Sequence, residues 1–140
     1  MKLLLDTNVL SEVTKPNPAE RVLEWLDKLD EDRSFISIVS VAEIQRGIAL
    51  MDKGRKRDAL AEWLAHDLTQ RFEHRIIPVD EPVALAWGDL MGQAKRRGRG
   101  RSSMGGLIAA NAVAHDLSLA TRNTRDFEGF GVELIDPWAR

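Results

Sequence analysis

The stretch Leu3-Leu4-Leu5-Asp6-Thr7-Asn8 decides the fold. Its three consecutive leucines, with no polar residue between them, are typical of a short strand that is buried on both faces of a parallel sheet. Asp6 follows at once, and Thr7 and Asn8 continue as a polar turn. The sequence therefore predicts a buried strand with a carboxylate at its carboxyl end. Similar runs predict further strands over residues 34–38, 76–79, 119–121 and 132–135.

Helical patterns fill the intervals between these strands. They predict helices over residues 19–29, 41–51, 60–72, 81–97 and 103–115. Because strands alternate with helices, we expect an α/β fold: one domain over residues 1–140, with a central parallel sheet of about five strands and helices on both faces. Pro78 predicts that its strand lies at an edge of the sheet. Ser40 is expected to cap the second helix, and Gly54 to end it.

The composition limits the possible chemistry. The chain has 140 residues, 44% of them hydrophobic, which suits one core without a disulfide or a structural metal. It has no cysteine, which excludes a zinc–thiolate site, an iron–sulfur cluster and a thiol nucleophile. The net charge of −2 argues against a generically basic nucleic-acid binder. No apolar run is long enough for a membrane span or a signal peptide, so we expect a soluble cytoplasmic protein without membrane contact.

Acidic and amide side chains lie just past the predicted strands, where parallel sheets bind their ligands. These residues are Asp6, Glu43, Asp80, Asn123 and Asp126. Carboxylates that converge there repel one another unless a cation lies between them, and all-oxygen ligands favour Mg²⁺ or Mn²⁺. Each position also has an ordinary structural explanation: a helix cap for Asp6, a capping box with Ser40 for Glu43, and a turn cap for Asp126.

Four segments together carry a family resemblance. They are Leu4-Leu5-Asp6-Thr7-Asn8-Val9-Leu10-Ser11-Glu12, Val41-Ala42-Glu43-Ile44-Gln45-Arg46-Gly47, Leu107-Ile108-Ala109-Ala110-Asn111-Ala112 and Thr121-Arg122-Asn123-Thr124-Arg125-Asp126-Phe127. In this order and spacing they resemble the PIN-domain toxins of the VapC type, and the ending Pro137-Trp138 resembles the FitB-like branch. The resemblance covers the whole chain and implies a single PIN-like domain.

The resemblance also implies an activity and its partners. It implies an endoribonuclease that depends on Mg²⁺ or Mn²⁺, with Asp6, Glu43 and Asp126 as catalytic residues. The implied metal ligands are Asp6 and Glu43 together with Asn123 or Asp126. The implied partners are an RNA substrate, a cognate VapB- or FitA-like antitoxin that holds the toxin inactive, and operator DNA reached only through that antitoxin. A homodimer is implied as well.

The sequence departs from the family at one position. The family places a third Asp at the start of the helix before Leu-Ile-Ala-Ala, and this chain has Gly105 there. Three explanations remain open: a toxin that lost activity and kept antitoxin binding, a variant recovered because active toxin poisons its host, or a site whose remaining ligands still hold one metal ion. We expect a weakened or inactive nuclease. The alternative function is a degenerate, non-catalytic PIN module that binds antitoxin, and operator DNA through it.

Residues 95–101, Lys-Arg-Arg-Gly-Arg-Gly-Arg, hold five positive charges. We interpret Arg97, Arg99 and Arg101 as contacts for RNA phosphates. The alternative is a solvated helix end, where cations also favour the helix dipole. Some apolar residues on the helices flanking residues 53–57 are expected to face a partner; the candidates are Ile48, Met51, Leu60, Trp63 and Leu64.

Two other enzyme classes fit the sequence less well. A phosphotransferase-type hydrolase would use Asp6 as a nucleophile, but it needs a second Asp two residues later, where this chain has Asn8. A receiver domain would place its phospho-acceptor after a central strand. Asp80 is the matching position, and it follows the strand that Pro78 places at an edge.

Overall fold

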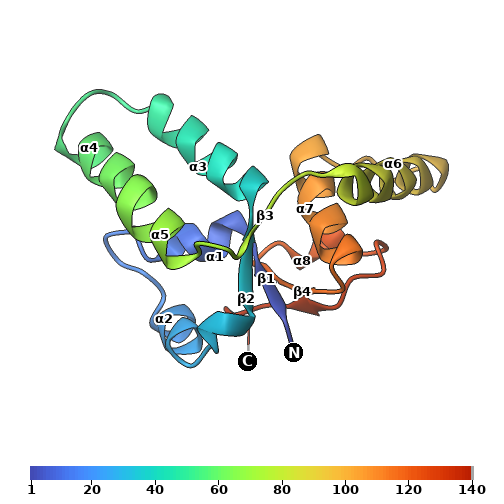
Figure 1. Cartoon of the computed structure of the whole chain (residues 1–140), viewed down its shortest axis with the longest axis horizontal. Helices are drawn as coiled ribbons and strands as arrows, with labels where there is room; N and C mark the ends of the chain where they lie inside the picture. The colour runs from blue at the N-terminus through green and yellow to red at the C-terminus, as the bar shows by residue number, and fades with distance from the viewer. Residues whose placement is uncertain (140) are drawn as a thin grey trace.

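The computed structural model describes residues 1–139 (Figure 1). The first half of the chain contains β1 (Leu3–Leu5), α1 (Thr7–Glu12), α2 (Glu20–Asp27), η1 (Glu31–Arg33), β2 (Ser34–Ser37), α3 (Ile38–Ala49), α4 (Arg55–Glu62), the π-helical turn η2 (Trp63–Leu68) and α5 (Thr69–Arg71). The second half contains β3 (Ile76–Ile77), α6 (Glu81–Arg96), α7 (Ser103–Ala114), β4 (Ser118–Ala120), α8 (Thr124–Phe127) and β5 (Leu134–Ile135).

The five strands form one parallel sheet in the order β3-β2-β1-β4-β5. β1 lies at the centre, with Leu4 paired to Phe35 of β2 on one side and to Leu119 of β4 on the other. The prediction of a parallel α/β sheet of five strands is confirmed, and so is the edge position of the strand that precedes Pro78. The carboxyl ends of β1 and β4 therefore lie side by side, which brings residues far apart in sequence to one edge.

Both faces of the sheet are covered by helices, as the run of leucines in β1 predicts. Leu4 packs into a core formed mainly by α6 and α7, whereas Leu3 and Leu5 pack into a second core with α1 and η2. Figure 1 shows α6 and α7 on one side of the sheet and α1 to α5 on the other. None of the helices in residues 1–139 is long and apolar enough to cross a membrane.

Two local predictions around α3 are wrong. Ser37, not Ser40, caps this helix, and its hydroxyl accepts the amide hydrogen of Val39 at 3.0 Å. Helix formation begins three residues earlier because Ser37 comes directly at the end of β2, which leaves no room for a loop. Ser40 is consequently buried inside the helix. Gly54 does not end α3 but precedes α4.

Candidate active site

A cavity of about 450 Å³ opens at the carboxyl ends of β1 and β4. The four predicted acidic and amide ligands line it: Asp6, Glu43, Asn123 and Asp126. They come from four places in the chain, namely the end of β1, α3, the turn after β4, and α8. Asp80 does not line this cavity and instead caps α6, accepting the amide hydrogen of Val83 at 3.2 Å. The receiver-type arrangement therefore has no counterpart at this site.

Asp6 is the most deeply buried carboxylate of the cavity, with 6% of its surface exposed. Its Oδ1 accepts the amide hydrogen of Thr7 at 2.8 Å, so it does cap α1, and its Oδ2 accepts the hydroxyl of Thr121 at 2.7 Å. Burial raises the pKa of Asp6, and the nearby carboxylates of Glu43 and Asp126 raise it as well, while the bonds from Thr121 and Thr7 lower it. Burial is the largest of these effects, so the protein disfavours the charged form of Asp6, and a cation in the cavity would favour that form.

Glu43 reaches the cavity from the first half of α3 and is half-buried. Its Oε1 accepts the hydroxyl of Thr7 at 2.7 Å, and the same hydroxyl oxygen lies 2.8 Å from Oγ of Ser40. The capping-box explanation of Glu43 is wrong, since Ser37 caps the helix. Glu43 is instead bonded to Thr7, the residue that follows Asp6, and this bond links α3 to the end of β1.

Asn123 and Asp126 lie on the short segment after β4. Both side chains are exposed, and both line the cavity. The segment is held from two sides: Asn123 N donates to Oγ1 of Thr121 at 3.0 Å, and Arg122 N donates to Oδ1 of Asn8 at 3.2 Å. The Asn8 amide group completes this link through longer contacts of 3.4 Å to Asp6 Oδ2 and Thr121 Oγ1.

Gly105 lines the same cavity from the first turn of α7. Its amide donates to the hydroxyl of Ser102, the cap of this helix, at 3.0 Å. A carboxylate at this position would therefore stand at the cavity wall. Gly105, where the sequence-based expectation places a missing Asp, thus lies at the cavity wall and contributes no side-chain ligand.

The basic segment is divided between a helix end and the cavity. Lys95 and Arg96 finish α6, and neither Arg97 nor Arg99 lines the cavity. Arg101 does line it, with its Nη2 donating to the carbonyl of Glu128 at 3.0 Å and its guanidinium 5.6 Å from the centre of the Phe130 ring. Arg101 is thus a fixed cation at the cavity wall, whereas the solvated-helix explanation fits Lys95 to Arg97.

The carboxylate and amide oxygens that line the cavity are ligands that a hard divalent cation prefers, although they are not already gathered into a metal site. No group of three His, Asp or Glu side chains within residues 1–139 stands close enough to hold an ion. Of the four ion pairs in this part of the chain, none involves Asp6, Glu43 or Asp126. Carboxylates that share a cavity and form no ion pair attract a cation, and Mg²⁺ commonly uses one or two carboxylates, with waters filling its other positions.

Thr7 and Thr121 have no predicted role, yet their hydroxyls bind the two inner carboxylates. Their positions could have indicated a role, because each threonine lies just after a predicted strand and close to a predicted ligand, in Asp6-Thr7-Asn8 and in Thr121-Arg122-Asn123. What the pattern does not reveal is which carboxylate each hydroxyl meets. Thr121 and Asp6 are 115 residues apart, and only the pairing of β1 with β4 brings them together.

Comparison with known proteins identifies the family. The sequence profile of the PIN domain matches residues 3–132. The chain belongs to the PIN-domain family. This PIN domain is 41% identical to Toxin FitB of Neisseria gonorrhoeae over 97% of its length and 98% of that protein. It is 38% identical to VapC ribonuclease Y4jK of Sinorhizobium fredii, covering 97% of each chain. A solved structure of FitAB bound to an IR36 DNA fragment superposes with a TM-score of 0.93 at 39% identity, covering 99% of this chain and 96% of that one.

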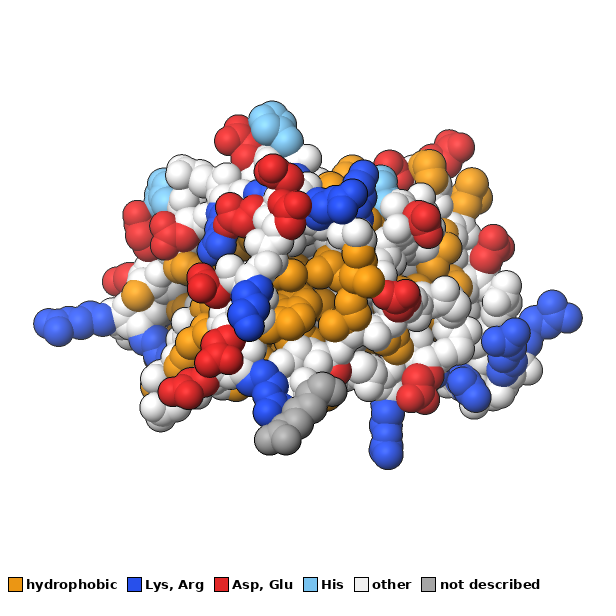
Figure 2. All heavy atoms as spheres, turned by 90° about the horizontal axis from the view of Figure 1, so that it is seen from below, with side chains coloured by type: hydrophobic (Ala, Val, Ile, Leu, Met, Phe, Trp, Pro, Cys, Tyr) orange, Lys and Arg blue, Asp and Glu red, His pale blue; other side chains and the backbone are white. Residues whose placement is uncertain are grey.

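A second hollow, the apolar groove, is lined by residues other than those of the carboxylate cavity. It has a volume of about 510 Å³ and is lined by apolar side chains of α1, α2 and η2, among them Val13, Leu23, Leu26 and Trp63. Glu24, Asp27, Glu31, Asp67 and Arg71 also line it, so its charged residues are mostly acidic, and we call them its acidic rim. Figure 2 shows a face on which hydrophobic side chains gather in the middle with acidic side chains along their edge. Of the residues expected to face a partner, Trp63 lines this groove, whereas Ile48 and Leu64 are buried in the core.

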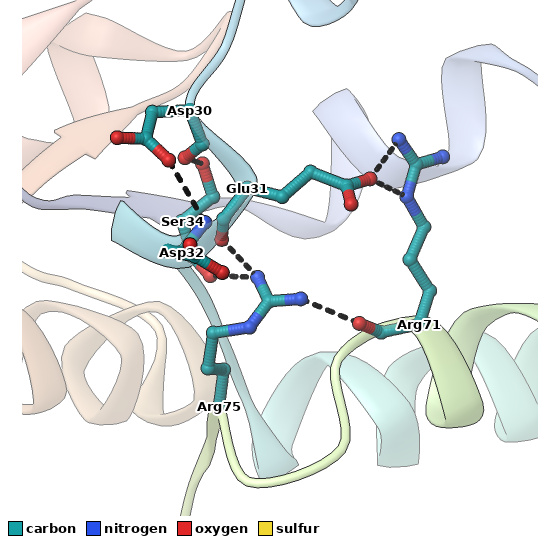
Figure 3. Close-up of polar contacts among 6 residues, drawn as sticks. All are labelled: Asp30, Glu31, Asp32, Ser34, Arg71 and Arg75. Carbon is teal, nitrogen blue, oxygen red and sulfur yellow. Dashed lines mark hydrogen bonds and ion pairs between the residues drawn. The ribbon is translucent and has the colours of Figure 1, made fainter.

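One wall of the apolar groove is held by a pair of arginines (Figure 3). Arg75 donates to the carbonyls of Glu31, Ser34 and Arg71, and its guanidinium lies 4.9 Å from the centre of the Phe72 ring. Arg71 pairs with the Glu31 carboxylate. These contacts join η1 to α5, so the groove wall is fixed before any partner binds.

Proposed function

We propose that this chain is the toxin of a toxin–antitoxin pair and hydrolyses RNA phosphodiester bonds as an endoribonuclease dependent on Mg²⁺ or Mn²⁺, with activity weakened by Gly105. The observation that carries the proposal is the convergence of Asp6, Glu43 and Asp126 on one cavity, where none of them takes part in an ion pair within residues 1–139. The names of relatives, a toxin and a VapC ribonuclease, support it.

Each residue has a role in this proposal. Asp6 and Glu43 are the residues that would hold the cation, with Asp126 or Asn123 as the outer ligand. When bound, a divalent cation activates a water molecule and stabilises negative charge at the phosphate. The hydroxyls of Thr7 and Thr121 hold the two inner carboxylates in place. Arg101, already oriented by Glu128 and Phe130, binds a phosphate of the RNA.

Cleavage of a defined RNA in Mg²⁺ tests this function. The wild-type chain should cleave slowly, chelation of the metal should stop cleavage, and Asp6→Ala should abolish it. The Asp6→Ala protein, purified in parallel, also controls for contaminating nuclease. Equal cleavage by wild type and Asp6→Ala would show that the carboxylate cavity is not the active site.

A second candidate is a PIN domain that binds a partner without cleaving RNA, and Gly105 is the observation that favours it. This function predicts no metal-dependent cleavage by the wild-type chain while the partner still binds. The decisive variant is Gly105→Asp. If it also fails to cleave RNA, restoring this one carboxylate is not sufficient for activity, and the binding function is supported.

The proposed partner is a cognate antitoxin, which the similarity to the FitAB complex supports. We place it at the apolar groove because of the groove's own side chains. The acidic rim formed by Glu24, Asp27, Glu31 and Asp67 complements a partner segment that carries apolar residues flanked by basic ones. Operator DNA is then bound only through the antitoxin, and the toxin is expected to form a homodimer. Co-expression with the neighbouring small gene, followed by mass measurement in solution, checks the pair and its stoichiometry.

A further inference from the structure

Thr121 has an unusual position for a hydroxyl group. It directly follows β4, none of its surface is exposed, and its Oγ1 donates to Oδ2 of Asp6 at 2.7 Å. A buried hydroxyl is costly unless it is hydrogen-bonded, and a bond to a carboxylate is stronger than one to a neutral acceptor. The Thr121 side chain therefore has one strongly preferred orientation.

The same oxygen makes a second bond on its other side. Oγ1 of Thr121 accepts the backbone amide hydrogen of Asn123 at 3.0 Å. A hydroxyl has a single proton to give, so the group donates to Asp6 and receives from Asn123. One side chain thus links the deepest carboxylate of the cavity to the segment that carries Asn123 and Asp126.

Both oxygens of Asp6 are held by this arrangement. Oδ1 is bonded to the amide of Thr7 and Oδ2 to the hydroxyl of Thr121, while Asp6 N donates to the carbonyl of Ala120 at 2.9 Å. The carboxylate plane is therefore fixed before a ligand arrives. Partners of this kind set the orientation of metal-binding side chains, and their loss typically lowers metal affinity by about 10–100-fold.

We propose that Thr121 is a positioning residue. Its hydroxyl sets the orientation of the Asp6 carboxylate and, through the bond from Asn123 N, the position of the Asn123–Asp126 segment relative to Asp6. The ligands from both places can then bind one divalent cation. This inference rests on the proposed function, since it assumes that the cavity binds a cation. It goes further by assigning the geometry of the ligand set to a single buried hydroxyl.

Binding of Mn²⁺ to the full chain without RNA tests the inference, with electron paramagnetic resonance to count free Mn²⁺. Thr121→Val keeps the volume of the side chain and replaces the hydroxyl by a methyl group. We expect it to weaken Mn²⁺ binding by about tenfold or more. Thr121→Ser keeps the hydroxyl and should restore nearly all of the affinity. If Thr121→Val does not fold, Thr121→Ala, which leaves space for a water, replaces it with the same expectation.

Ser34→Ala is the matched control, because it removes another buried hydroxyl at the opposite end of the sheet, bonded to the carbonyl of Asp30 at 3.0 Å. Thermal unfolding should show a loss of stability in both variants, while only Thr121→Val loses Mn²⁺ affinity. Wild-type affinity in Thr121→Val, with weak binding in Asp6→Ala, overturns the role of Thr121 alone. Equal binding by wild type and Asp6→Ala overturns the metal site itself, and with it the proposed function.

Discussion

The amide of Gly105 donates to the hydroxyl of Ser102 at 3.0 Å, and a Cβ at position 105 would lie 2.8 Å from that same oxygen. Any side chain at position 105 would therefore contact Ser102, the residue that caps the same helix. Ser102 is exposed, so its side chain has room to move by the few tenths of an ångström that a Cβ needs. A carboxylate side chain can therefore be introduced at position 105 at a small cost in capping geometry.

Gly105→Asp should raise metal-dependent RNA cleavage, because it adds an oxygen ligand at the wall of the cavity. We expect an increase of about tenfold or more, the scale on which changes around a metal site alter activity. Gly105→Ala is the control, since it adds the Cβ without the carboxylate and should leave cleavage low. Equal activation by both variants would assign the effect to helix stability rather than to metal binding.

The fold and the site differ in how far the sequence predicts them. The run Leu3-Leu4-Leu5 predicts a central strand because a strand without polar alternation must be covered on both faces. The positions of Asp6, Glu43 and Asp126 follow from the rule for strand ends in parallel sheets. Their hydrogen-bond partners do not follow, because the link from Asp6 to Thr121 depends on which strands are neighbours, and the order of the strands is not written in any single segment.

The error at the start of α3 has a physical reason as well. Ser37 and Ser40 are both good caps, and local pattern alone favours Ser40 because Glu43 stands three residues later. In the structure Ser37 Oγ also donates to Oδ1 of Asn111 at 2.5 Å, a contact with α7 that no local pattern reveals. This tertiary contact helps to fix where the helix begins. Because Ser37 is the cap, Glu43 takes no part in a capping box and accepts the hydroxyl of Thr7 instead.

Gly106→Ala should destabilise the fold at the contact of α6 with α7. An added Cβ would lie 2.6 Å from Sδ of Met91 and 3.1 Å from Nε1 of Trp87, which is itself bonded to the carbonyl of Ser103. Overpacking of this kind costs about 1–3 kcal/mol, partly offset by the better helix propensity of alanine. Gly92→Ala, on α6 with nothing within 4 Å, should instead be stabilising. Urea unfolding of both variants checks the opposite signs.

Glu12→Gln should reduce stability near neutral pH and change its pH dependence. Glu12 is 3% exposed, and its pKa lies below the ordinary value of 4.5 because of its bonds with Lys15 and the amide of Ala19. An acid with a lowered pKa in the folded state contributes stability above its unfolded pKa and loses it as pH falls through its folded pKa. The difference in unfolding free energy, about 1–2 kcal/mol near pH 7, should therefore shrink steadily below pH 4.5.

Unfolding in urea at a series of pH values measures this difference. Glu24→Gln is the control, since Glu24 is an exposed glutamate on the neighbouring helix α2. It should change stability little at any pH. A gap between wild type and Glu12→Gln that stays constant down to pH 3 would mean that the ion pair with Lys15 does not stabilise the fold.

Val13→Glu should weaken binding of the antitoxin, because it places a charge inside the apolar groove and adds to its acidic rim. Val13 is 44% exposed, so the substitution should leave the fold intact. Val113, on α7, is 42% exposed and lies outside the groove, which makes Val113→Glu a closely matched control. Co-purification of each variant with the antitoxin gives the comparison. Full binding by Val13→Glu would place the partner elsewhere, and equal loss in both variants would show that the effect is not specific to the groove.

Arg101→Ala should weaken RNA binding more than Arg97→Ala, although both remove one positive charge. Arg101 lines the cavity and is oriented by the carbonyl of Glu128 and the ring of Phe130, whereas Arg97 follows the last turn of α6 outside the cavity. A phosphate contact releases counterions, so its loss flattens the salt dependence of binding by about one unit of slope. RNA affinity measured over a range of salt concentrations, in the Asp6→Ala background to prevent cleavage, separates the two arginines. An unchanged slope in Arg101→Ala would mean that this side chain only holds the loop before α7 against Phe130.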